Sequence, residues 1–562
     1  VDRHADADLV DLGGGGIEAS SVAATDRDEC SLGGERLGRP QPEARRPSGN
    51  SGTTARDPEI HVTTVGAARR LGSTMFTRES MSEYSSLPGR PAGASDQLSL
   101  DAIADAEPYP FWLESAEVPE SNPTLVRDEH CDLCIVGGGY TGLWTAITAK
   151  ERDPERDVVV IDKGEVGGAA SGRNGGFMES SLTHGVGNGM DRHADEIDIL
   201  EELGLRNLNE IEATIERYGI DCDYERNGVI DVATTSHPPS YLDGLREEHD
   251  LLRSLGQKVE WLDCEQMRAE VDSPTYTGGL FRTSRAALVD PAKLAWELKR
   301  VAEELGVRIY EHTKATDVDK DGSGVAIRTP LGTVRCSRAV LGTNADKPLL
   351  RRIRQYMVPV YDYCMVTEPL SDEQLGRIGW ARRQGLSDIT NHFHYYRLTA
   401  DNRILWGGYD AIYYWGSNVS IEQESRPETW ATLSRHFFET FPQLDDITFT
   451  HAWGGAIDTS TRFSVFFGTA MSDRVAYAVG YTGLGVAATR FAATTMLDLL
   501  AGRKSIATKT DFVQSKPLPF PPEPFRFIGI QATRWSLDHE DKTGKRNTWL
   551  RTLDRLGLGF DT

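Results

Sequence analysis

A glycine-rich turn at residues 137–142 constrains the fold of this chain most, because it fits the pattern G-x-G-x-x-G. An apolar run precedes the turn, and a second apolar run ends at Asp162, about twenty residues beyond Gly142. In such a unit Gly137 permits a tight turn, Gly139 lets a pyrophosphate approach the backbone, and Gly142 lets a helix pack on the first strand. The stretch therefore predicts a strand–turn–helix–strand unit that binds a dinucleotide at the helix N-terminus.

The acid at the end of the second strand supports the same interpretation. A carboxylate at this distance can accept hydrogen bonds from the two ribose hydroxyls of an ADP moiety. The alternative is a glycine turn that serves only packing, but the flanking strands, the helix and the acid favour binding. The candidate cofactor-binding residues of this unit are Gly137, Gly139, Tyr140, Thr141, Gly142, Asp162 and Lys163.

A second glycine cluster follows almost directly and indicates which dinucleotide is bound. Serine, arginine and asparagine interleave with its glycines, so the backbone can pass close to a flat ring while side chains donate to phosphate and ribityl oxygens. This suits a long, extended FAD better than a nicotinamide cofactor, whereas the alternative is a flexible loop. The candidates are Ser171, Gly172, Arg173, Asn174, Gly175 and Gly176.

A third glycine turn lies near the other end of the chain, between a short apolar run and a helical pattern at 491–500. A helix N-terminus here, directed at the flavin pyrimidine, would stabilise the negative charge of the reduced ring. Three widely separated turns are thus predicted to meet on one FAD. The candidates in this turn are Gly480, Thr482, Gly483, Leu484, Gly485 and Val486.

With these turns the chain resembles the D-amino-acid oxidase family of FAD-dependent oxidoreductases, near the branch of gamma-glutamylputrescine oxidoreductase and of glycine and D-amino-acid dehydrogenases. The resemblance covers residues 105 to 505 approximately. Its other carriers are Pro110–Trp112, Leu288–Pro291 and Ala339–Ala345. It implies that main-chain groups near Ala315 hold the adenine, and that Thr343 and Asn344 close the FAD site.

Two departures from the family pattern bear on the cofactor. Relatives often have histidine where Leu484 stands, and the sarcosine oxidases with covalent flavin have a cysteine near this region. No cysteine follows Cys364 in this chain. We therefore expect FAD to be bound non-covalently.

The implied fold class is α/β, with an FAD-binding Rossmann-like domain of the glutathione-reductase type and an inserted mixed-sheet α+β substrate domain. A disordered N-terminal extension is expected before it, because that stretch has few aromatic residues and no sustained period. The first methionines are Met75 and Met81, and translation starting at one of them is a further hypothesis. The expected segments are 1–100 for the extension, 126–180, 285–350 and 450–503 for the FAD domain, 181–284 and 351–449 for the substrate domain, and 504–562 for a Pro-rich strap with a terminal helix.

Composition excludes several other classes. A formal net charge of −24 lacks the basic surface that nucleic acid requires. No run approaches the roughly 20 apolar residues of a membrane span, and none resembles a secretion signal, so a cytoplasmic protein is the simplest expectation. Seven cysteines, an odd number, suggest reduced thiols, and Cys131 and Cys134 are interpreted as structural thiols rather than a redox pair or half a zinc site.

The resemblance implies oxidation of an amine or amino acid. Hydride passes from the substrate carbon to flavin N5, the imine hydrolyses, and oxygen or another acceptor takes the electrons. No catalytic triad or metal site is evident, so the flavin carries the chemistry. Two alternatives remain: an FAD-dependent dehydrogenase of a hydroxy acid or polyol, and a non-catalytic flavin relay subunit.

The strand at 393–398 is the best candidate for the substrate face. Arg397 could pair with a substrate carboxylate, while Tyr395 and Tyr396 could line an amine channel through cation–π contacts. The alternative is an ordinary aromatic sheet. Asp388 and His392 are weaker candidates.

Overall fold

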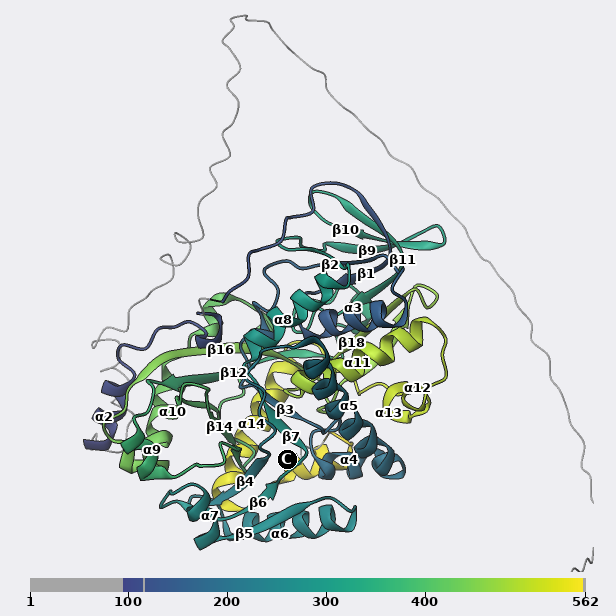
Figure 1. The fold of residues 1–562 in the computed structure, drawn as a ribbon. Helices are drawn as coiled ribbons and strands as arrows, with labels where there is room; N and C mark the ends of the chain where they lie inside the picture. The colour runs from purple at the N-terminus through teal and green to yellow at the C-terminus, as the bar shows by residue number, and fades with distance from the viewer. Residues whose placement is uncertain (1–93, 115–116, 559–562) are drawn as a thin grey trace, which may run out of the picture. The chain divides into compact units, whose positions relative to one another are not determined.

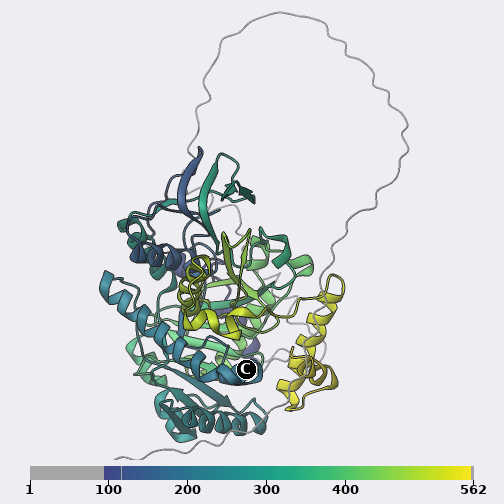
Figure 2. The same ribbon diagram turned by 90° about the vertical axis from the view of Figure 1, so that its right-hand side faces the viewer.

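The computed structural model describes residues 94–114 and 117–558, drawn in two orientations in Figures 1 and 2. Most of the extension predicted at 1–100 lies outside these residues. Helix α2, Ala94–Ala102, packs against helix α10, Pro427–Thr440. In this contact Ser434 Oγ donates a hydrogen bond of 2.7 Å to Ser99 O. Residues 97–100 of the predicted extension therefore belong to the fold.

The first large sheet is built around β1, the strand that precedes the first glycine turn. Its order is β17-β18-β11-β1-β2-β8, and β10 and β9 extend it from β11. β1 pairs in parallel with β2 and β11, and contains the free thiols of Cys131 and Cys134. The core strand β2 is fully buried: Val158 and Val160 belong to one apolar cluster, and Val159 and Ile161 belong to another on the opposite face. The bounds are β1 Glu129–Val136, β2 Val158–Ile161, β8 Arg308–Tyr310, β9 Asp317–Asp321, β10 Gly324–Arg328, β11 Thr333–Leu341, β17 Phe466–Ala470 and β18 Val475–Val479.

Three helices share the apolar core of this sheet: α3, Tyr140–Arg152, α8, Pro291–Glu304, and α11, Gly485–Leu500. In Figure 1 α3 lies between α8 and α11, and it contacts both. α8 begins where the carboxylate of Asp290 accepts hydrogen bonds from Ala292 N and Lys293 N, at 2.9 and 3.0 Å. α8 then leads into β8, the strand that pairs with β2.

The second large sheet is mixed and has the order β16-β12-β15-β14-β13-β4-β6-β5. Helix α10 covers part of one face, where Phe437 packs edge-on against Trp406. Helix α6, Pro239–Ser254, packs on β5 and β6. The strand bounds are β4 Val229–Thr234, β5 Val259–Asp263, β6 Tyr276–Arg282, β12 Val358–Thr367, β13 Gly385–Asp388, β14 His394–Leu398, β15 Ile404–Gly408 and β16 Phe449–Thr459.

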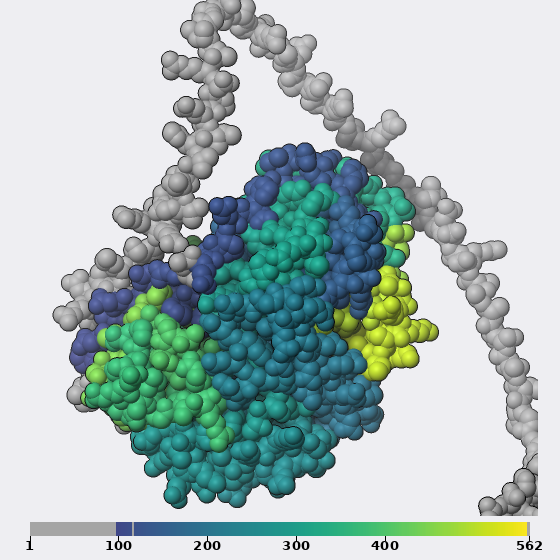
Figure 3. Space-filling view, in the orientation of Figure 1, coloured from purple at the N-terminus to yellow at the C-terminus, as the bar shows by residue number. Residues whose placement is uncertain are grey.

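Two helices close one end of this sheet. They are α7, Cys264–Glu270, and α9, Asp372–Ile378. Two backbone hydrogen bonds join their C-terminal ends: Trp380 N donates 3.0 Å to Glu270 O, and Asp272 N donates 2.7 Å to Ile378 O. The space-filling view of Figure 3 shows the teal segment that contains α7 beside the green segment that contains α9. Residues about a hundred positions apart are thus joined into one layer.

The predicted fold class, an α/β FAD-type fold with a second mixed sheet, is confirmed, whereas the domain boundaries stay a prediction. Two segments lie across them. β16, placed at the start of the third FAD segment, pairs with β12 along its length in the second sheet. Helix α5, Ile197–Tyr218, placed in the substrate domain, packs against α11 and shares the core of the first sheet.

The C-terminal part forms more structure than the single terminal helix that the sequence predicted. Two short helices, α12, Ile506–Lys509, and α13, Asp511–Gln514, precede the proline-rich strap. After the strap come α14, Phe525–Thr543, and α15, Thr548–Arg555, drawn in yellow in Figure 2. Within residues 94–114 and 117–558, no helix has the length and apolar character needed to cross a bilayer.

The contact between α3 and β1 generates a stability prediction. A Cβ atom on Gly142 would lie 1.8 Å from Gly137 O and 3.2 Å from Ile135 Cγ2. The substitution Gly142→Ala should therefore push α3 off β1 and lower the free energy of unfolding by about 3 kcal/mol. Urea unfolding followed by circular dichroism measures it.

The matched control is Gly376→Ala in α9, where a Cβ would meet no atom within 4 Å. This variant should be neutral, or more stable by up to about 1 kcal/mol, since alanine favours helix. Equal stability of Gly142→Ala and the wild type would contradict the close-packing account.

Candidate cofactor and substrate site

One large cavity, of about 1620 Å³, is lined by residues of all three glycine turns, of the second sheet and of helices α14 and α15. Pockets for a single small molecule usually enclose about 300–1,000 Å³. This cavity is larger, and its lining changes along its length from glycine-rich loops to an aromatic and acidic sheet face. It is therefore suited to a long ligand together with a second, smaller one.

The first glycine turn presents backbone groups at the start of α3. Gly137 has a φ of +112°, in the left-handed region, and its N–H donates 2.8 Å to Ile161 O. Tyr140 N donates 3.0 Å to Ser171 Oγ, which ties the first turn to the second. Gly137, Gly139, Tyr140 and Thr141 line the cavity. The positive end of the α3 dipole is thus directed at this part of the cavity.

Asp162 lies at the end of β2 and lines the cavity, as its predicted ribose-binding role requires. Its Oδ2 accepts 2.6 Å from Gly138 N, and its Oδ1 accepts 2.8 Å from Gly164 N. Burial raises the pKa of Asp162, and these two hydrogen bonds oppose that shift. Neighbouring Lys163 forms an ion pair of 2.5 Å with Asp346.

The residues predicted near the adenine gather at this same part of the lining. Ala315 and its two predecessors follow β8, the strand beside β2, and Thr313 N donates 2.6 Å to Asp162 O. Thr343 and Asn344 follow β11, on the other side of β1. Ala315, Thr343 and Asn344 all line the cavity.

The second turn is held rigidly by its own asparagine. Asn174 Nδ2 donates 3.0 Å to both Ala170 O and Ser171 O, and Asn174 Oδ1 accepts 2.9 Å from Gly176 N. Trp112, in the predicted family element before β1, donates 2.9 Å through Nε1 to Asn174 O. This turn is therefore a fixed wall rather than the flexible loop considered as the alternative.

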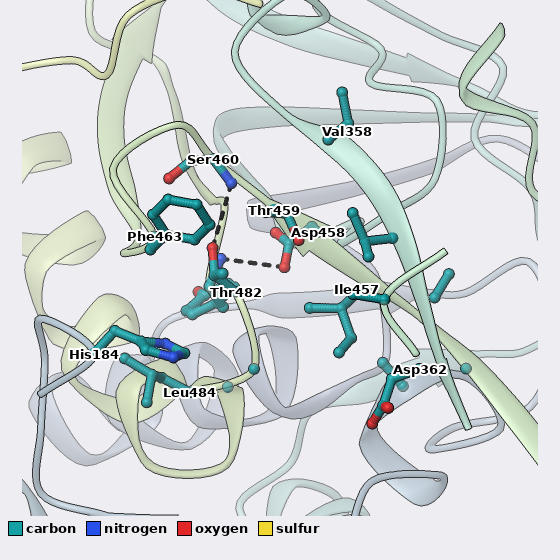
Figure 4. A pocket seen from close by; sticks show the side chains of 18 of the residues that line it. His184, Val358, Asp362, Ile457, Asp458, Thr459, Ser460, Phe463, Thr482 and Leu484 are labelled. Atoms are coloured by element: carbon teal, nitrogen blue, oxygen red, sulfur yellow. Dashed lines mark hydrogen bonds between the residues drawn. The ribbon is translucent and has the colours of Figure 1, made fainter. Parts of the chain in front are cut away.

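The third turn joins the first through side chains. Thr141 Oγ1 donates 3.0 Å to Tyr481 OH. The buried carboxylate of Asp458, at the end of β16, accepts 2.6 Å from Gly480 N and 3.2 Å from Tyr481 N. Burial raises the pKa of Asp458 to about 7. Figure 4 shows Asp458, Thr482 and Leu484 around this part of the cavity.

The structure thus brings the three predicted turns together. From the second turn Ser171, Arg173, Asn174 and Gly175 line the cavity, and from the third turn residues 482–486 do. Four predicted glycines are not in the lining, because they pack behind it: Gly142, Gly172, Gly176 and Gly480.

Of the three predicted substrate residues, only Tyr395 lines the cavity. Its hydroxyl donates 2.6 Å to Asp362 Oδ2. Tyr396 points to the other side of the sheet, where its hydroxyl lies 2.8 Å from Tyr276 OH in the aromatic core. The prediction that Tyr396 lines the amine channel is therefore wrong.

Arg397 also departs from its predicted role. Its side chain is only 2% exposed, and its Nη1 donates 2.6 Å to Val289 O and 3.4 Å to Gly176 O. The guanidinium is thus engaged by carbonyls behind the second glycine turn and does not reach the cavity. The predicted pairing of Arg397 with a substrate carboxylate is wrong, because period-two alternation gives the face of a residue but not its depth.

Sequence reasoning missed the C-terminal helices as walls of the cavity. Ile530, Arg534 and Leu537 of α14 line it, together with Trp549 and Leu553 of α15. The helical apolar pattern after the proline-rich strap was the only signal, and it predicted a helix without saying what the helix covers.

The carboxylate of Asp541 in α14 bonds to helix α6 and to the loop between β13 and β14. Asp541 accepts hydrogen bonds of 2.8 Å from Tyr241 OH, 3.0 Å from Asn391 N, and 3.0 and 2.8 Å from His392 N and Nδ1. His392, a weaker candidate for substrate contact, is thus occupied with this anchor while it lines the cavity. Although burial opposes ionisation, the hydrogen bonds from His392, Asn391 and Tyr241 hold the pKa of Asp541 below its usual range.

Comparison with known proteins agrees with this geometry. The model of the family described as FAD dependent oxidoreductase matches residues 132–499. Gamma-glutamylputrescine oxidoreductase of Escherichia coli is 31% identical over 400 residues, covering 70% of this chain and 88% of the relative. A probable oxidoreductase of Haemophilus influenzae is 28% identical over 402 residues, with the same coverage.

Solved structures show the same fold. The crystal structure of glycine oxidase from Geobacillus kaustophilus has a TM-score of 0.58 at 19% identity, covering 69% of this chain and all of that one. The chain belongs to the FAD dependent oxidoreductase family, often called the D-amino-acid oxidase family. It is accordingly an enzyme, an oxidoreductase with FAD as its cofactor.

The residues present fit FAD. The first turn has no room for a side chain at Gly139, where a Cβ would lie 2.8 Å from Ser171 Oγ, so its backbone stays exposed to the cavity as a phosphate site requires. An acid stands at the end of β2, and two helix N-termini, those of α3 and α11, open onto the same cavity. The lining is continuous from Ala315 to Val486, as an extended dinucleotide requires.

The Asp541 anchor generates a second stability prediction. Asp541→Ala should remove the partner of His392 and lower the free energy of unfolding by about 3 kcal/mol at neutral pH. Because the folded-state pKa of Asp541 is lowered, its contribution is present above the unfolded value of about 3.9 and is lost as pH falls below it. The difference from wild type should therefore shrink on acidification.

Asp538→Ala is the control on the same helix, since Asp538 forms a surface ion pair of 2.7 Å with Lys542, four residues on. It should change stability by less than about 0.5 kcal/mol. Urea unfolding at several pH values decides, and equal effects of the two variants would contradict the anchor.

Proposed function

We propose that this enzyme oxidises the C–N bond of an amine or amino acid. One observation supports this most: the FAD cradle and a wall carrying Tyr395 and Asp362 share one cavity, and they meet where Tyr395 packs on Gly175. Gamma-glutamylputrescine oxidoreductase and glycine oxidase, by their names, act on amine-containing substrates. The chain covers 88% of the first relative and 54% of the second.

The proposed cofactor contacts follow the lining. The N–H groups of Gly139 and Thr141 would hold the pyrophosphate, since those of Gly137, Gly138 and Tyr140 already donate within the protein. Asp162 would hold the ribose and the segment at Ala315 the adenine, with Thr343 and Asn344 closing that end. Residues 171–176 and 482–486 would flank the ring, with the α11 N-terminus near its pyrimidine. When bound, FAD supplies the acceptor for the hydride that leaves the substrate carbon.

The protein's own part is to orient the amine, to keep it unprotonated at the reacting nitrogen and to exclude water. The rings of Tyr395, Phe177 and Phe393 lie together, with centroids 5.7 and 6.4 Å from that of Tyr395. They give this part of the cavity an apolar wall that desolvates a substrate. The imine product would then hydrolyse in water to a carbonyl compound and ammonia or a smaller amine.

Anaerobic reduction of the bound flavin tests the proposal. The purified enzyme is mixed with D-amino acids, glycine, sarcosine and putrescine derivatives, and the visible absorbance of oxidised flavin is followed. At least one amine should bleach it. Bleaching by hydroxy acids or polyols alone would favour the dehydrogenase alternative, and bleaching by no compound would favour a relay subunit.

The cradle itself generates a binding prediction. Gly139→Val should collide with Ser171 Oγ and with the pyrophosphate, so the flavin-to-protein ratio should fall at least tenfold, a loss of about 1.4 kcal/mol or more in binding. Gly187→Ala is the control, because Gly187 also lines the cavity but a Cβ there meets no atom within 4 Å. A Gly139→Val protein that is fully loaded with FAD would contradict the assignment.

A further inference from the structure

Within residues 94–114 and 117–558, one carboxylate of the cavity forms no ion pair with a cationic side chain. Asp362, in the middle of β12, lines the cavity, and Figure 4 shows its side chain beside Ile457. Its Oδ2 accepts 2.6 Å from Tyr395 OH. Within the residues that the structure describes, Asp362 takes part in no ion pair, unlike Asp410 nearby, which pairs with Arg426 and Arg534.

This carboxylate lies next to the predicted flavin cradle. Its partner Tyr395 approaches the second glycine turn so closely that a Cβ on Gly175 would lie 2.6 Å from Tyr395 Cε2. Asp362 is also paired across the sheet with Gly455, where a Cβ would lie 3.9 Å from Arg173 Cβ. The carboxylate of Asp362 is therefore separated from the proposed position of the flavin ring by one side chain, that of Tyr395.

Arginine side chains around the cavity already have partners within the protein. This matters because amino-acid carboxylates are typically bound by a bidentate guanidinium. Arg397 is buried against carbonyls, as shown above. The arginines that line the cavity are Arg173, with Glu424; Arg282, with Asp231 and Glu179; Arg526, with Ser417 and Pro521; Arg534, with Asp410; and Arg546, with Glu540.

We propose that Asp362 binds an ammonium group of the substrate other than the reacting nitrogen, and that the substrate is a cationic diamine or polyamine rather than a zwitterionic amino acid. The inference rests on the proposed amine oxidation and names its substrate class. Tyr395 holds one carboxylate oxygen, which leaves lone pairs for an N⁺–H donor, and the aromatic rings of Tyr395 and Phe393 add cation–π attraction. An amino acid would instead bring its own carboxylate close to Asp362 and repel it.

The charge state of Asp362 agrees with this role. Burial raises its pKa to about 6, and the hydrogen bond from Tyr395 opposes the shift. Asp410 raises the pKa further and His394 lowers it. The carboxyl group is therefore ionised at neutral pH, and a cation that arrives in the cavity offsets the cost of burying the charge.

Asp362→Asn tests the proposal, because asparagine keeps the shape and the acceptor for Tyr395 OH while it removes the charge. The FAD-loaded protein is titrated anaerobically with putrescine, glycine and D-alanine, and the change of flavin absorbance gives the apparent dissociation constant and the rate of reduction. In wild type we expect putrescine to reduce the flavin better than either amino acid. Asp362→Asn should weaken putrescine binding at least tenfold.

Two further variants separate charge at this position from other effects. Tyr395→Phe keeps the charge and loses one hydrogen bond, so the affinity for putrescine should fall less than in Asp362→Asn. Glu247→Gln changes an exposed carboxylate on α6 that also lines the cavity, and it should leave the affinity unchanged. Butane-1,4-diol, the neutral analogue, should compete equally weakly in wild type and in Asp362→Asn.

The melting temperature distinguishes a binding role of Asp362 from a structural one, because the two roles predict changes of opposite sign in Asp362→Asn. The folded-state pKa of Asp362 is raised, so its ionised form opposes folding above about pH 6. Asp362→Asn should therefore melt at the same or a higher temperature than wild type at pH 8, while it binds putrescine less well. A lower melting temperature with unchanged putrescine affinity would show a structural role and overturn the inference.

The remaining outcomes distinguish this inference from the proposed function. Reduction by glycine or D-alanine but not by putrescine would overturn the cationic substrate and leave amine oxidation standing. Equal affinity of wild type and Asp362→Asn for putrescine would overturn the role of Asp362 alone. Reduction by no amine at all would contradict the proposed function itself, and this inference with it.

Discussion

The close contact of helix α3 with strand β1 is the constraint on which the site depends. It requires glycine at position 142, since a Cβ there would overlap Gly137 O. With α3 held in this place, its first N–H groups face the cavity, and two hydrogen bonds fix the other turns against it. Tyr140 N binds Ser171 of the second turn, and Thr141 Oγ1 binds Tyr481 of the third. Segments separated by more than three hundred residues are thereby joined around one cavity.

The second sheet adds chemistry to this cradle. It meets the glycine turns at Gly175, where the ring of Tyr395 occupies the space that a side chain on residue 175 would need. The same tyrosine holds Asp362, so the position of the carboxylate follows from the position of the cofactor loop. Helices α14 and α15, which lie beyond the residues matched by the family model, complete the wall through the Asp541 anchor. The second sheet and the C-terminal helices thus form the walls of the cavity on the sides that the glycine turns leave open.

The glycine turns could be predicted from sequence because each demands a particular backbone approach that only glycine permits, as Gly137 and Gly142 illustrate. The fold class followed from these turns and from the family resemblance that they carry. The substrate wall could not be predicted to the same depth. Alternation along β14 placed Tyr395 and Arg397 on one face, but Arg397 is turned to carbonyls of Gly176 and Val289 that lie far away in sequence. Asp362 gave no local signal, because what distinguishes it is the absence of an ion-pair partner in the folded structure.

The proposed site requires one FAD lying along the cavity without a covalent bond. Heating the purified protein, removing the precipitate and analysing the supernatant for flavin tests this most directly. We predict about one FAD per chain in the supernatant, with fluorescence that rises when phosphodiesterase cleaves its pyrophosphate. Three results would contradict this arrangement: a colourless protein, a flavin without the adenine part, or a flavin that remains attached to the precipitated chain after proteolysis.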